Sequence, residues 1–414
     1  MQKKYKTFLQ LIAVIIGSVL VLLLSSCDHV SQKGDLVNHH ADIGRSNSYE
    51  HFGEFLSYNY YTDTIPKANS AGAIVPPLAL SNQELIYATT RGTIMLTTNK
   101  DMLWEKFLDS NTAINAYMCA DKEQNIYAVS NTGTIYSYSV SGELRWKKQI
   151  ADTLSDSGIP CDLLAIDDGI LAGTTDGVLV KFAFDGKLLW KKSFPSGIGR
   201  TISANETNPI ITIASANEND TLAMLAADGT IKWKAAAGTR LVKYPAINAD
   251  AICCTGLKYV GTEALAVILV YDLSGKVKWT KELAFVPRYL SVADNGDVYA
   301  NVFQAGIGEQ VSAVIRYNKD GKMIWKKYFN LTIPTPVLIS KSLLAFMGVT
   351  HNAVGLYFVN KETGVIQSIQ SYSNEHPTIQ SATVRPDGAI SFAYYQKIGF
   401  IRADEPWINK VLPW

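Results

Sequence analysis

The side chains with the clearest chemical potential are an adjacent pair of cysteines and an adjacent pair of histidines. Cys253 and Cys254 stand next to each other in "AICCTG", where a vicinal disulfide would need a strained turn. His39 and His40 stand next to each other in a polar segment. Two neighbouring histidines there lack the fixed third and fourth ligands that a metal ion needs, so we predict no metal site.

Cys27 is a third candidate because of the segment in front of it. The chain begins with "MQKKYK", which supplies three lysines, and continues with the uncharged apolar run "FLQLIAVIIGSVLVLLL". This order is typical of a secretory export signal. The run Leu24-Ser25-Ser26-Cys27 resembles the bacterial lipobox, and the resemblance implies cleavage before Cys27 and lipidation of its thiol. An uncleaved membrane anchor is the alternative, although 17 apolar residues are few for a spanning helix.

The mature chain is expected to be nearly neutral. The whole chain has 38 Lys and Arg against 37 Asp and Glu, and residues 1–26 contain three lysines and no acid. Without a strong excess of positive charge, nucleic acid is not expected as a partner. Residues 27–50 are polar and show no apolar period, which predicts a flexible tether behind the lipidated cysteine.

A repeat defines the elements that must position these side chains. Six tryptophans recur at spacings of 42, 44, 43, 46 and 46 residues, and in five of the six units a glycine stands four residues before the ring. Such a ring buries on the order of 200 Å² and can offer its indole N–H to a backbone carbonyl. We therefore predict one blade-docking tryptophan per unit: Trp104, Trp146, Trp190, Trp233, Trp279 and Trp325.

Each unit has the pattern of a four-stranded antiparallel meander. In residues 158–194, "VLVKFAF" alternates as a half-buried strand does, and "DGK" then turns the chain. Asp-Gly between alternating runs predicts a two-residue hairpin turn, because Gly accepts a positive φ. A unit of about 43 residues with four strands must stack on its neighbours, which predicts an all-β, eight-bladed β-propeller.

The last two units are degenerate, and the ring must also close. Ser368 replaces the tryptophan of the seventh unit, and Trp407 marks the eighth. Residues 51–61 are rich in aromatic side chains, and we predict that they pair with the last blade so that no edge strand stays open. The predicted organisation is a signal peptide over 1–26, a tether over 27–50 and one propeller over 51–414.

The pattern D-x-G-x-x-x-W, or D-G-x-x-x-W, resembles the repeat of the pyrroloquinoline-quinone (PQQ) propellers over nearly all of the mature chain. Eight such blades behind a lipobox resemble the BamB-type lipoproteins of the outer-membrane barrel-assembly machinery. The resemblance implies a non-catalytic scaffold, anchored in the bacterial cell envelope, that binds envelope proteins such as the barrel-assembly machinery. The outer membrane is favoured, and Asp28, which resembles an inner-membrane retention signal of enteric bacteria, keeps the inner membrane open.

An enzyme is the less favoured interpretation. PQQ-dependent alcohol dehydrogenases carry a vicinal disulfide against the cofactor, but Cys253 and Cys254 fall in the second strand of the fifth unit, where consecutive side chains point to opposite faces. The chain has no Cys-x-x-Cys-His motif for a c-type haem. His351 and His376 fall in different units, so no histidine-based metal cluster is expected. We predict no cofactor and no catalytic residue.

Two questions stay open at the level of the sequence. Cys119 and Cys161 lie in separate units and could form a disulfide only if their Cα atoms came within about 7 Å, so buried free thiols are the favoured prediction. The alternative functions are a ligand- or glycan-binding module of the cell envelope and a PQQ-dependent dehydrogenase.

Overall fold

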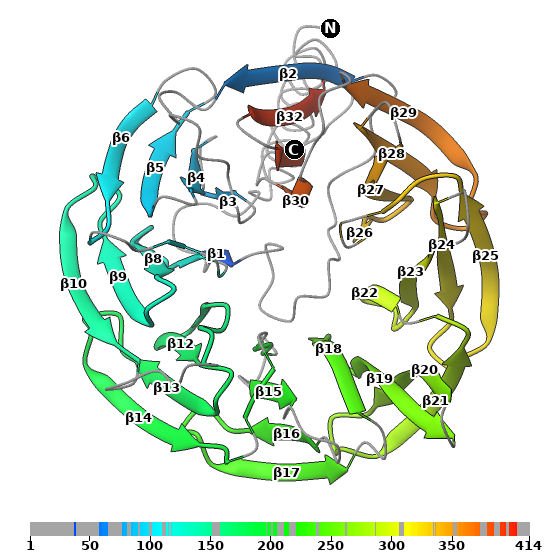
Figure 1. Ribbon diagram of the computed structural model, residues 1–414, viewed down its shortest axis with the longest axis horizontal. Helices are drawn as coiled ribbons and strands as arrows, with labels where there is room; N and C mark the ends of the chain where they lie inside the picture. Colours follow the sequence, from blue (N-terminus) through cyan, green and yellow to red (C-terminus); the bar gives the residue numbers. More distant parts are fainter. Residues whose placement is uncertain are drawn as a thin grey trace, which may run out of the picture.

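The computed structural model arranges antiparallel β-sheets around a central axis, and in the described residues there are eight sheets (Figure 1). It describes residues 37–38, 58–64 and, with gaps, 77–403; the longest gaps are 151–157, 205–210, 215–220, 373–378 and 385–389. Every described element is a strand. The predicted all-β, eight-bladed propeller is therefore confirmed. The part of the chain that is described contains no helix long and apolar enough to cross a membrane.

Blades 1 to 4 follow the chain, and each runs from an inner to an outer strand. Blade 1 consists of β3 (Leu78–Ala79), β4 (Leu85–Ala88), β5 (Thr93–Thr97) and β6 (Met102–Phe107). Blade 2 consists of β7 (Cys119–Ala120), β8 (Ile126–Val129), β9 (Thr134–Tyr138) and β10 (Leu144–Gln149), and β1 (Val37–Asn38) pairs with β7. Blade 3 consists of β11 (Leu164–Ile166), β12 (Gly169–Gly173), β13 (Val178–Phe182) and β14 (Leu188–Ser193). The three described strands of blade 4 are β15 (Ile211–Ala214), β16 (Thr221–Leu225) and β17 (Ile231–Ala236).

Blades 5 to 8 complete the ring. Blade 5 consists of β18 (Arg240–Ile247), β19 (Ile252–Val260), β20 (Glu263–Tyr271) and β21 (Val277–Leu283). Blade 6 consists of β22 (Pro287–Val292), β23 (Val298–Ala305), β24 (Gln310–Tyr317) and β25 (Met323–Phe329). Blade 7 consists of β26 (Leu338–Ile339), β27 (Leu343–Val349), β28 (Val354–Asn360) and β29 (Ile366–Tyr372). Blade 8 consists of β30 (Ile379–Val384), β31 (Ile390–Tyr394), β32 (Lys397–Ala403) and β2 (Tyr58–Thr64).

The second described strand and the last one meet in blade 8. β2 pairs antiparallel with β32 over all seven residues, from Tyr58 opposite Ala403 to Thr64 opposite Lys397. The outer strand of this blade therefore comes from the N-terminal side of the chain (Figure 1). Trp407, the marker of the eighth sequence unit, lies outside the described residues.

The core lies between the blades. Every residue of the second strand of blade 3, Gly169–Gly173, is buried, because neighbouring blades cover both faces of that sheet. The outer strand Leu188–Ser193 alternates exposed and half-buried residues along much of its length. This difference explains why the inner strands are almost continuously apolar while the outer strands mix apolar residues with lysine.

In blades 2 to 6 the turn into the outer strand is one residue longer than the predicted two-residue turn, and in blade 7, where the Asn360 N–H donates to Val365 O, it is two residues longer. In blade 3 the Gly186 N–H donates to Ala183 O and the Ala183 N–H donates to Lys187 O, which leaves three residues in the loop. Gly186 has a φ of 86°, and Asp185 is not among the residues with positive φ. A two-residue type I′ turn needs positive φ at both central positions, so the chain forms a type I turn followed by a left-handed glycine.

A β-bulge follows this turn in every outer strand from β6 to β29. In blade 3, Lys181 is opposite Trp190 while Phe182 is opposite Leu188, so Leu189 is the extra residue. The same shift stands before the ring in blades 1, 2, 4, 5 and 6 and before Ser368 in blade 7. Because a bulge re-aims the side chains beside it, Leu188 and Leu189 are both exposed and the Trp190 ring turns toward the next blade.

Candidate functional site: the blade junctions

Six outer-strand tryptophans contact the next blade through their indole N–H. Each donates to a backbone carbonyl in the last turn of the following blade, with nitrogen-to-oxygen distances from 2.8 to 3.1 Å. The pairs are Trp104 with Val140, Trp146 with Phe184, Trp190 with Ala227, Trp233 with Leu273, Trp279 with Lys319 and Trp325 with Lys361. The tryptophan is thus the side chain that joins one sheet to the next.

The turn glycine is what lets the ring come so close. A Cβ atom placed on Gly229, whose φ is 81°, would lie 2.9 Å from Cδ2 of Trp190. Gly142, Gly186, Gly275 and Gly321 meet the preceding ring in the same way. The glycine is therefore required twice, once for its left-handed backbone and once for the space that the indole fills.

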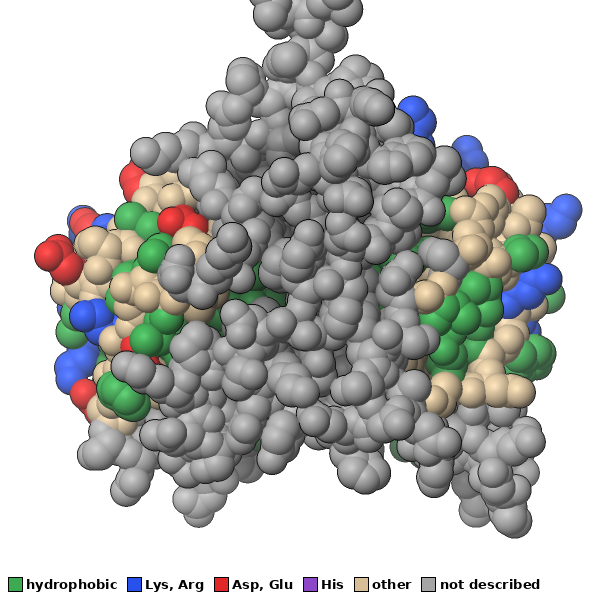
Figure 2. All heavy atoms as spheres, turned by 90° about the horizontal axis from the view of Figure 1, so that it is seen from above, with side chains coloured by type: hydrophobic (Ala, Val, Ile, Leu, Met, Phe, Trp, Pro, Cys, Tyr) green, Lys and Arg blue, Asp and Glu red, His purple; other side chains and the backbone are tan. Residues whose placement is uncertain are grey.

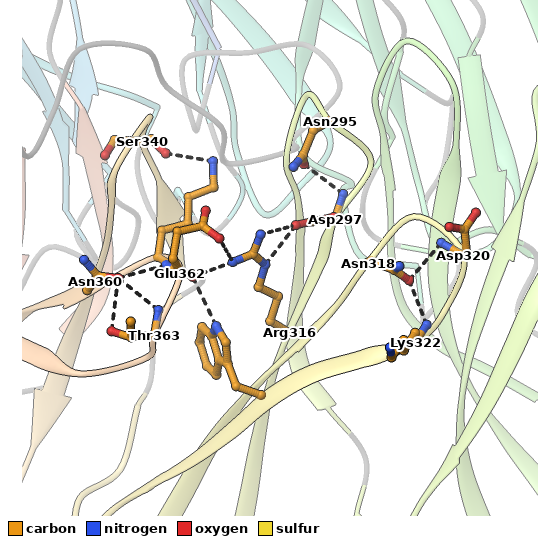
Figure 3. A network of polar contacts seen from close by, with 12 residues as sticks. Asn295, Asp297, Arg316, Asn318, Asp320, Lys322, Ser340, Asn360, Glu362 and Thr363 are labelled. Carbon is orange, nitrogen blue, oxygen red and sulfur yellow. Dashed lines mark hydrogen bonds and ion pairs between the residues drawn. The ribbon is translucent and has the colours of Figure 1, made fainter.

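In blade 6 a buried arginine reinforces the junction (Figure 3). Arg316 donates to Asp297 through Nε at 2.8 Å and pairs with it through Nη2 at 2.7 Å, and the two side chains are only 8% and 7% exposed. Its Nη1 reaches the next blade, at 2.9 Å from Lys361 O and 2.7 Å from Glu362 Oε2. Because Trp325 donates to the same Lys361 oxygen, one carbonyl receives both a cation and an indole.

Blades 2 and 3 have the same arrangement, with different cations. In blade 3 the Lys181 Nζ lies 2.6 Å from Asp168 and donates to Ala227 O at 3.0 Å, the oxygen that also accepts from Trp190. In blade 2 it is Arg145 that shares the Phe184 oxygen with the neighbouring indole, and it lies 4.0 Å from the buried Asp121. We call these three sites the cation junctions: Arg145 with Asp121, Lys181 with Asp168, and Arg316 with Asp297.

Tyr127 belongs to the junction of blade 2. Its hydroxyl donates to Asp121 at 2.6 Å and accepts from Arg145 at 3.0 Å. Burial and the Asp121 carboxylate together raise the pKa of Tyr127 far above its usual value, so the phenol stays neutral. Every polar group of this junction therefore has a partner of the right type.

The chemistry of the cation junctions is structural. Their cations are held by carboxylate and carbonyl oxygens, and only the Arg316–Asp297 pair is buried on both sides. Removing one partner of such a buried pair is costly, because the other charge is then left buried without its counter-ion. The three junctions fasten blade 2 to blade 3, blade 3 to blade 4, and blade 6 to blade 7. The propeller is thereby a rigid platform for whatever its surfaces contact.

The cation junctions were not predicted from the sequence, although a signal for two of them is present. Lys181 and Arg316 each stand nine residues before the repeat tryptophan, at a position that is otherwise Met224 or Val270 in blades 4 and 5. Asp297 directly follows the turn at 294–296 and is buried against Arg316. A Lys or Arg at a repeat position that is apolar in other blades is the sequence pattern that indicates these two cation junctions.

The four cysteines of the described residues, Cys119, Cys161, Cys253 and Cys254, are buried thiols that form no disulfide. Cys253 packs in the apolar cluster shared with blade 6, and Cys254 packs in the cluster shared with blade 4. Burial raises the pKa of both thiols, and that of Cys254 to about 12. The pair therefore presents no vicinal disulfide to a quinone, and these residues do not fit the role that they have in PQQ-dependent dehydrogenases.

Several of the candidates lie outside the described residues, namely Cys27, His39, His40, His351 and His376. Within the part of the chain that is described, no group of three or more His, Cys, Asp or Glu side chains is placed to hold a metal ion.

A family model described as outer membrane protein assembly factor BamB matches residues 131–366, more than half of the 414 residues. The match runs from the turn before β9 of blade 2 to Ile366, the first residue of the outer strand of blade 7. The predicted PQQ-like propeller repeat is thereby confirmed. No curated protein sequence matches the chain.

Solved structures share the fold at low sequence identity. BamB from Moraxella catarrhalis is 13% identical with a TM-score of 0.60, and the alignment covers 84% of this chain and 100% of that chain. A quinohemoprotein alcohol dehydrogenase from Comamonas testosteroni is 10% identical with a TM-score of 0.68, covering 92% and 83%. The Dos1 propeller is 12% identical with a TM-score of 0.60, covering 86% and 96%. At identities of 10% to 13% the likeness concerns the fold alone.

Proposed function

The chain belongs to the family described as outer membrane protein assembly factor BamB, and we propose that it is a membrane-anchored, non-catalytic propeller that binds other proteins of the bacterial cell envelope. Its role on this proposal is that of a scaffold in outer-membrane protein assembly. The observation that carries it is the family match over blades 2 to 7. The rigid blade junctions support it, since a platform that holds its shape loses little entropy on binding.

The anchor in this proposal is Cys27. The lipobox-like Leu24-Ser25-Ser26-Cys27 would place the acylated cysteine 31 residues before Tyr58, the first residue of the strand that closes the ring. An anchor confines the propeller to the membrane surface and raises its effective concentration toward membrane-bound partners, so that weak contacts suffice. We favour the outer membrane as its location.

The partner contact that we propose lies on the hairpin of blade 5. β19 and β20 have nine residues each, whereas the second and third strands of blades 1 to 3 have four or five. The tip carries Tyr259 and Val260, which are 57% and 54% exposed. An aromatic side chain at the end of a projecting hairpin is the type of residue that anchors a protein interface.

Site-specific photocrosslinking in the native membrane tests the proposal. A photoreactive phenylalanine analogue replaces Tyr259 in the full chain, and crosslinked proteins are identified by mass spectrometry. The expected result is recovery of components of the outer-membrane assembly machinery. The matched control places the same analogue at Phe107, an exposed ring on the outer strand of blade 1, where we expect much weaker capture of the same proteins.

The outcomes separate the contact from the function. Capture of assembly components at Phe107 but not at Tyr259 would overturn the hairpin contact and leave the scaffold role in place. Capture of no envelope protein from several exposed positions would overturn the scaffold role. In the same strain, Cys27→Ala is expected to abolish incorporation of labelled fatty acid, and unchanged labelling would overturn the lipid anchor.

A further inference from the structure

The outer strands divide the ring into a basic arc and an arc without an excess of positive charge, which includes β2 of blade 8 with Asp63 as its one charged residue. The outer strands of blades 2 to 6 (β10, β14, β17, β21 and β25), which we call the basic rim, read "LRWKKQ", "LLWKKS", "IKWKAA", "VKWTKEL" and "MIWKKYF". Together they contain eleven Lys and Arg and one acid, Glu282, which is itself paired with Lys258. The outer strands of blades 1 and 7 read "MLWEKF" and "IQSIQSY" and have no net charge.

Protection of the strand edges does not account for this asymmetry. Lysine on an edge strand prevents edge-to-edge aggregation, and that is one reason to find it on a propeller rim. However, β29 of blade 7 has the same bulged outer position and no charged residue. Within the described residues, only Arg145 and Lys147 among the cations of the basic rim form an ion pair. Most of the excess charge is therefore available to an external anion.

Apolar side chains stand beside these cations. Leu144, Leu188, Ile231, Val277 and Met323 occur two residues before the tryptophan in the five strands of the basic rim, and all are exposed. The β-bulge adds exposed Leu189 and Ile324 next to two of them. Figure 2, which views the ring edge-on from the side of blade 8, shows Lys and Arg side chains next to hydrophobic ones on both flanks, with Asp and Glu side chains among them.

We propose that the basic rim binds the surface of an anionic lipid bilayer. Lys191 and Lys192 would contact lipid phosphates while Leu188 and Leu189 enter the boundary between headgroups and acyl chains. The outer strands of the neighbouring blades also combine lysines with exposed aliphatic side chains. The propeller can therefore contact the membrane with its outer rim. The basic rim adjoins the blade 5 hairpin, since Glu282 of β21 pairs with Lys258 of β19, but Tyr259 and Val260 at the hairpin tip are not part of the rim.

The mixed chemistry favours a lipid surface over an acidic polypeptide. An acidic peptide offers carboxylates to the lysines and nothing to the exposed aliphatic side chains between them. An anionic bilayer offers both, since phosphates lie directly over an apolar layer. The basic rim is also convex and spans five blades, so a flat surface can meet it at any pair of adjacent blades.

An environment-sensitive fluorescent amino acid tests the proposal on the full-length chain reconstituted in vesicles. It replaces Leu188 in one variant and Leu103, on the neutral outer strand of blade 1, in the control; both side chains are 49% exposed. The vesicles contain phosphatidylcholine alone or a mixture with phosphatidylglycerol. We expect a blue shift and about a twofold or greater rise in emission at position 188 in anionic vesicles only, reversed by 1 M salt, where the screening length is about 3 Å.

Charge reversal supplies the second measurement. Lys191→Glu with Lys234→Glu is expected to reduce the response at position 188 at least about tenfold, while Lys106→Glu on blade 1 leaves it unchanged. Circular dichroism verifies that each variant is folded. An equal response at positions 188 and 103, or no response at 188 in anionic vesicles, overturns the proposal. A response at 188 to polyglutamate but not to anionic vesicles would also overturn it and assign the basic rim to an acidic protein.

Discussion

Trp190 contributes both a packed ring and an indole hydrogen bond to the junction of blades 3 and 4, and two substitutions separate these contributions. Trp190→Ala removes the ring from the junction of blades 3 and 4 and is expected to lower the free energy of unfolding by about 3–5 kcal/mol. Trp190→Phe keeps most of the ring and removes the hydrogen bond to Ala227 O. We expect a loss of about 1 kcal/mol, because Lys181 still donates to that oxygen.

Trp233→Phe in blade 4 is the matched comparison for this prediction. Its acceptor, Leu273 O, receives no described cation, so the loss of the indole N–H leaves this carbonyl without its partner. Trp233→Phe should therefore destabilise more than Trp190→Phe in chemical denaturation followed by circular dichroism. The reverse order would mean that Lys181 does not support the junction.

Removing Arg316 alone is expected to lower the free energy of unfolding more than replacing Arg316 and Asp297 together with apolar residues. Arg316→Ala leaves the Asp297 carboxylate buried without a cation and should lower the free energy of unfolding by about 3–5 kcal/mol. The double variant Arg316→Met with Asp297→Leu should recover most of that loss, because no buried charge remains. Glu362→Gln should cost under about 1 kcal/mol, since Glu362 is 68% exposed. Denaturation midpoints of the three variants check the order; a double variant no better than Arg316→Ala would contradict it.

The buried thiols predict a loss of stability at alkaline pH. A thiol has a pKa of about 8.5 in the unfolded chain, whereas burial raises the pKa of Cys254 to about 12 in the fold. The unfolded chain therefore loses its proton first, and stability should be complete below about pH 8.5 and fall as pH rises toward 12, by up to about 1.4 kcal/mol per pH unit. Unfolding midpoints between pH 8 and 11 measure this slope.

Cys254→Ala is the control for the alkaline effect. It should flatten the pH dependence relative to the parent chain, while Cys253, whose pKa is also raised by burial, and the titrating tyrosines continue to contribute. At pH 8 a thiol reagent should modify Cys253 and Cys254 only after unfolding, because both are buried. Rapid modification of the native chain at these positions would contradict their placement in the two blade cores.

At the scale of the element, the turn glycine and the ring form one unit. Gly229→Ala places a Cβ at a φ of 81° and 2.9 Å from Trp190 Cδ2, so it should cost the left-handed strain of about 1–2 kcal/mol and a further steric term. In a double-mutant cycle with Trp190→Ala the steric term should disappear, because the ring is gone.

Gly296→Ala isolates the backbone strain. Its φ is 84°, and the new Cβ would meet the Lys319 side chain at 3.0 Å instead of an indole. This substitution should cost about 1–2 kcal/mol, less than Gly229→Ala. Additive effects of Gly229→Ala and Trp190→Ala would show that ring and turn are not coupled. Thermal unfolding of the four variants provides the measurement.

At the scale of the molecule, the ring depends on the pairing of β2 with β32. Tyr60 lies opposite Ile401, so Tyr60→Cys with Ile401→Cys should form a disulfide within one chain under mild oxidation. Such a bond closes a loop of more than 300 residues, and the chain-entropy model predicts a gain of about 6 kcal/mol. The measurements are gel mobility without reductant and the denaturation midpoint with and without reductant.

A shifted cysteine pair is the control for ring closure. Asp63 lies opposite Ile398, so Asp63→Cys with Ile401→Cys is out of register and should crosslink poorly. Deletion of residues 58–64 should expose the edge of β32 and promote self-association at high protein concentration. Equal crosslinking of both pairs, or a monomeric deletion variant of unchanged stability, would contradict the closure.

The sequence by itself determined the blade count, because each blade buries the same positions and so repeats the same local pattern every 42 to 46 residues. It also indicated the glycine of the turn. It missed the turn type, since one positive φ at Gly186 and none at Asp185 produces a three-residue loop. Residue preferences alone do not distinguish a two-residue type I′ hairpin from this three-residue loop. The pairing register of the third strand with the bulged outer strand decides between the two.

Only the tertiary structure decided how the blades are joined. The acceptor of each indole lies 36 to 40 residues further along the chain, in a carbonyl that no side-chain pattern marks. In the sequence, Lys181 and Arg316 are not distinguished from other basic residues of a strand. Only the stacking of the next blade places a carbonyl oxygen beside each of them, next to the carboxylate of their own blade. The distribution of charge around the rim has the same origin, because a nearly neutral composition becomes a basic arc only when five outer strands lie side by side. The sequence determines the local periodicity, whereas the contacts between repeats depend on how the repeats stack.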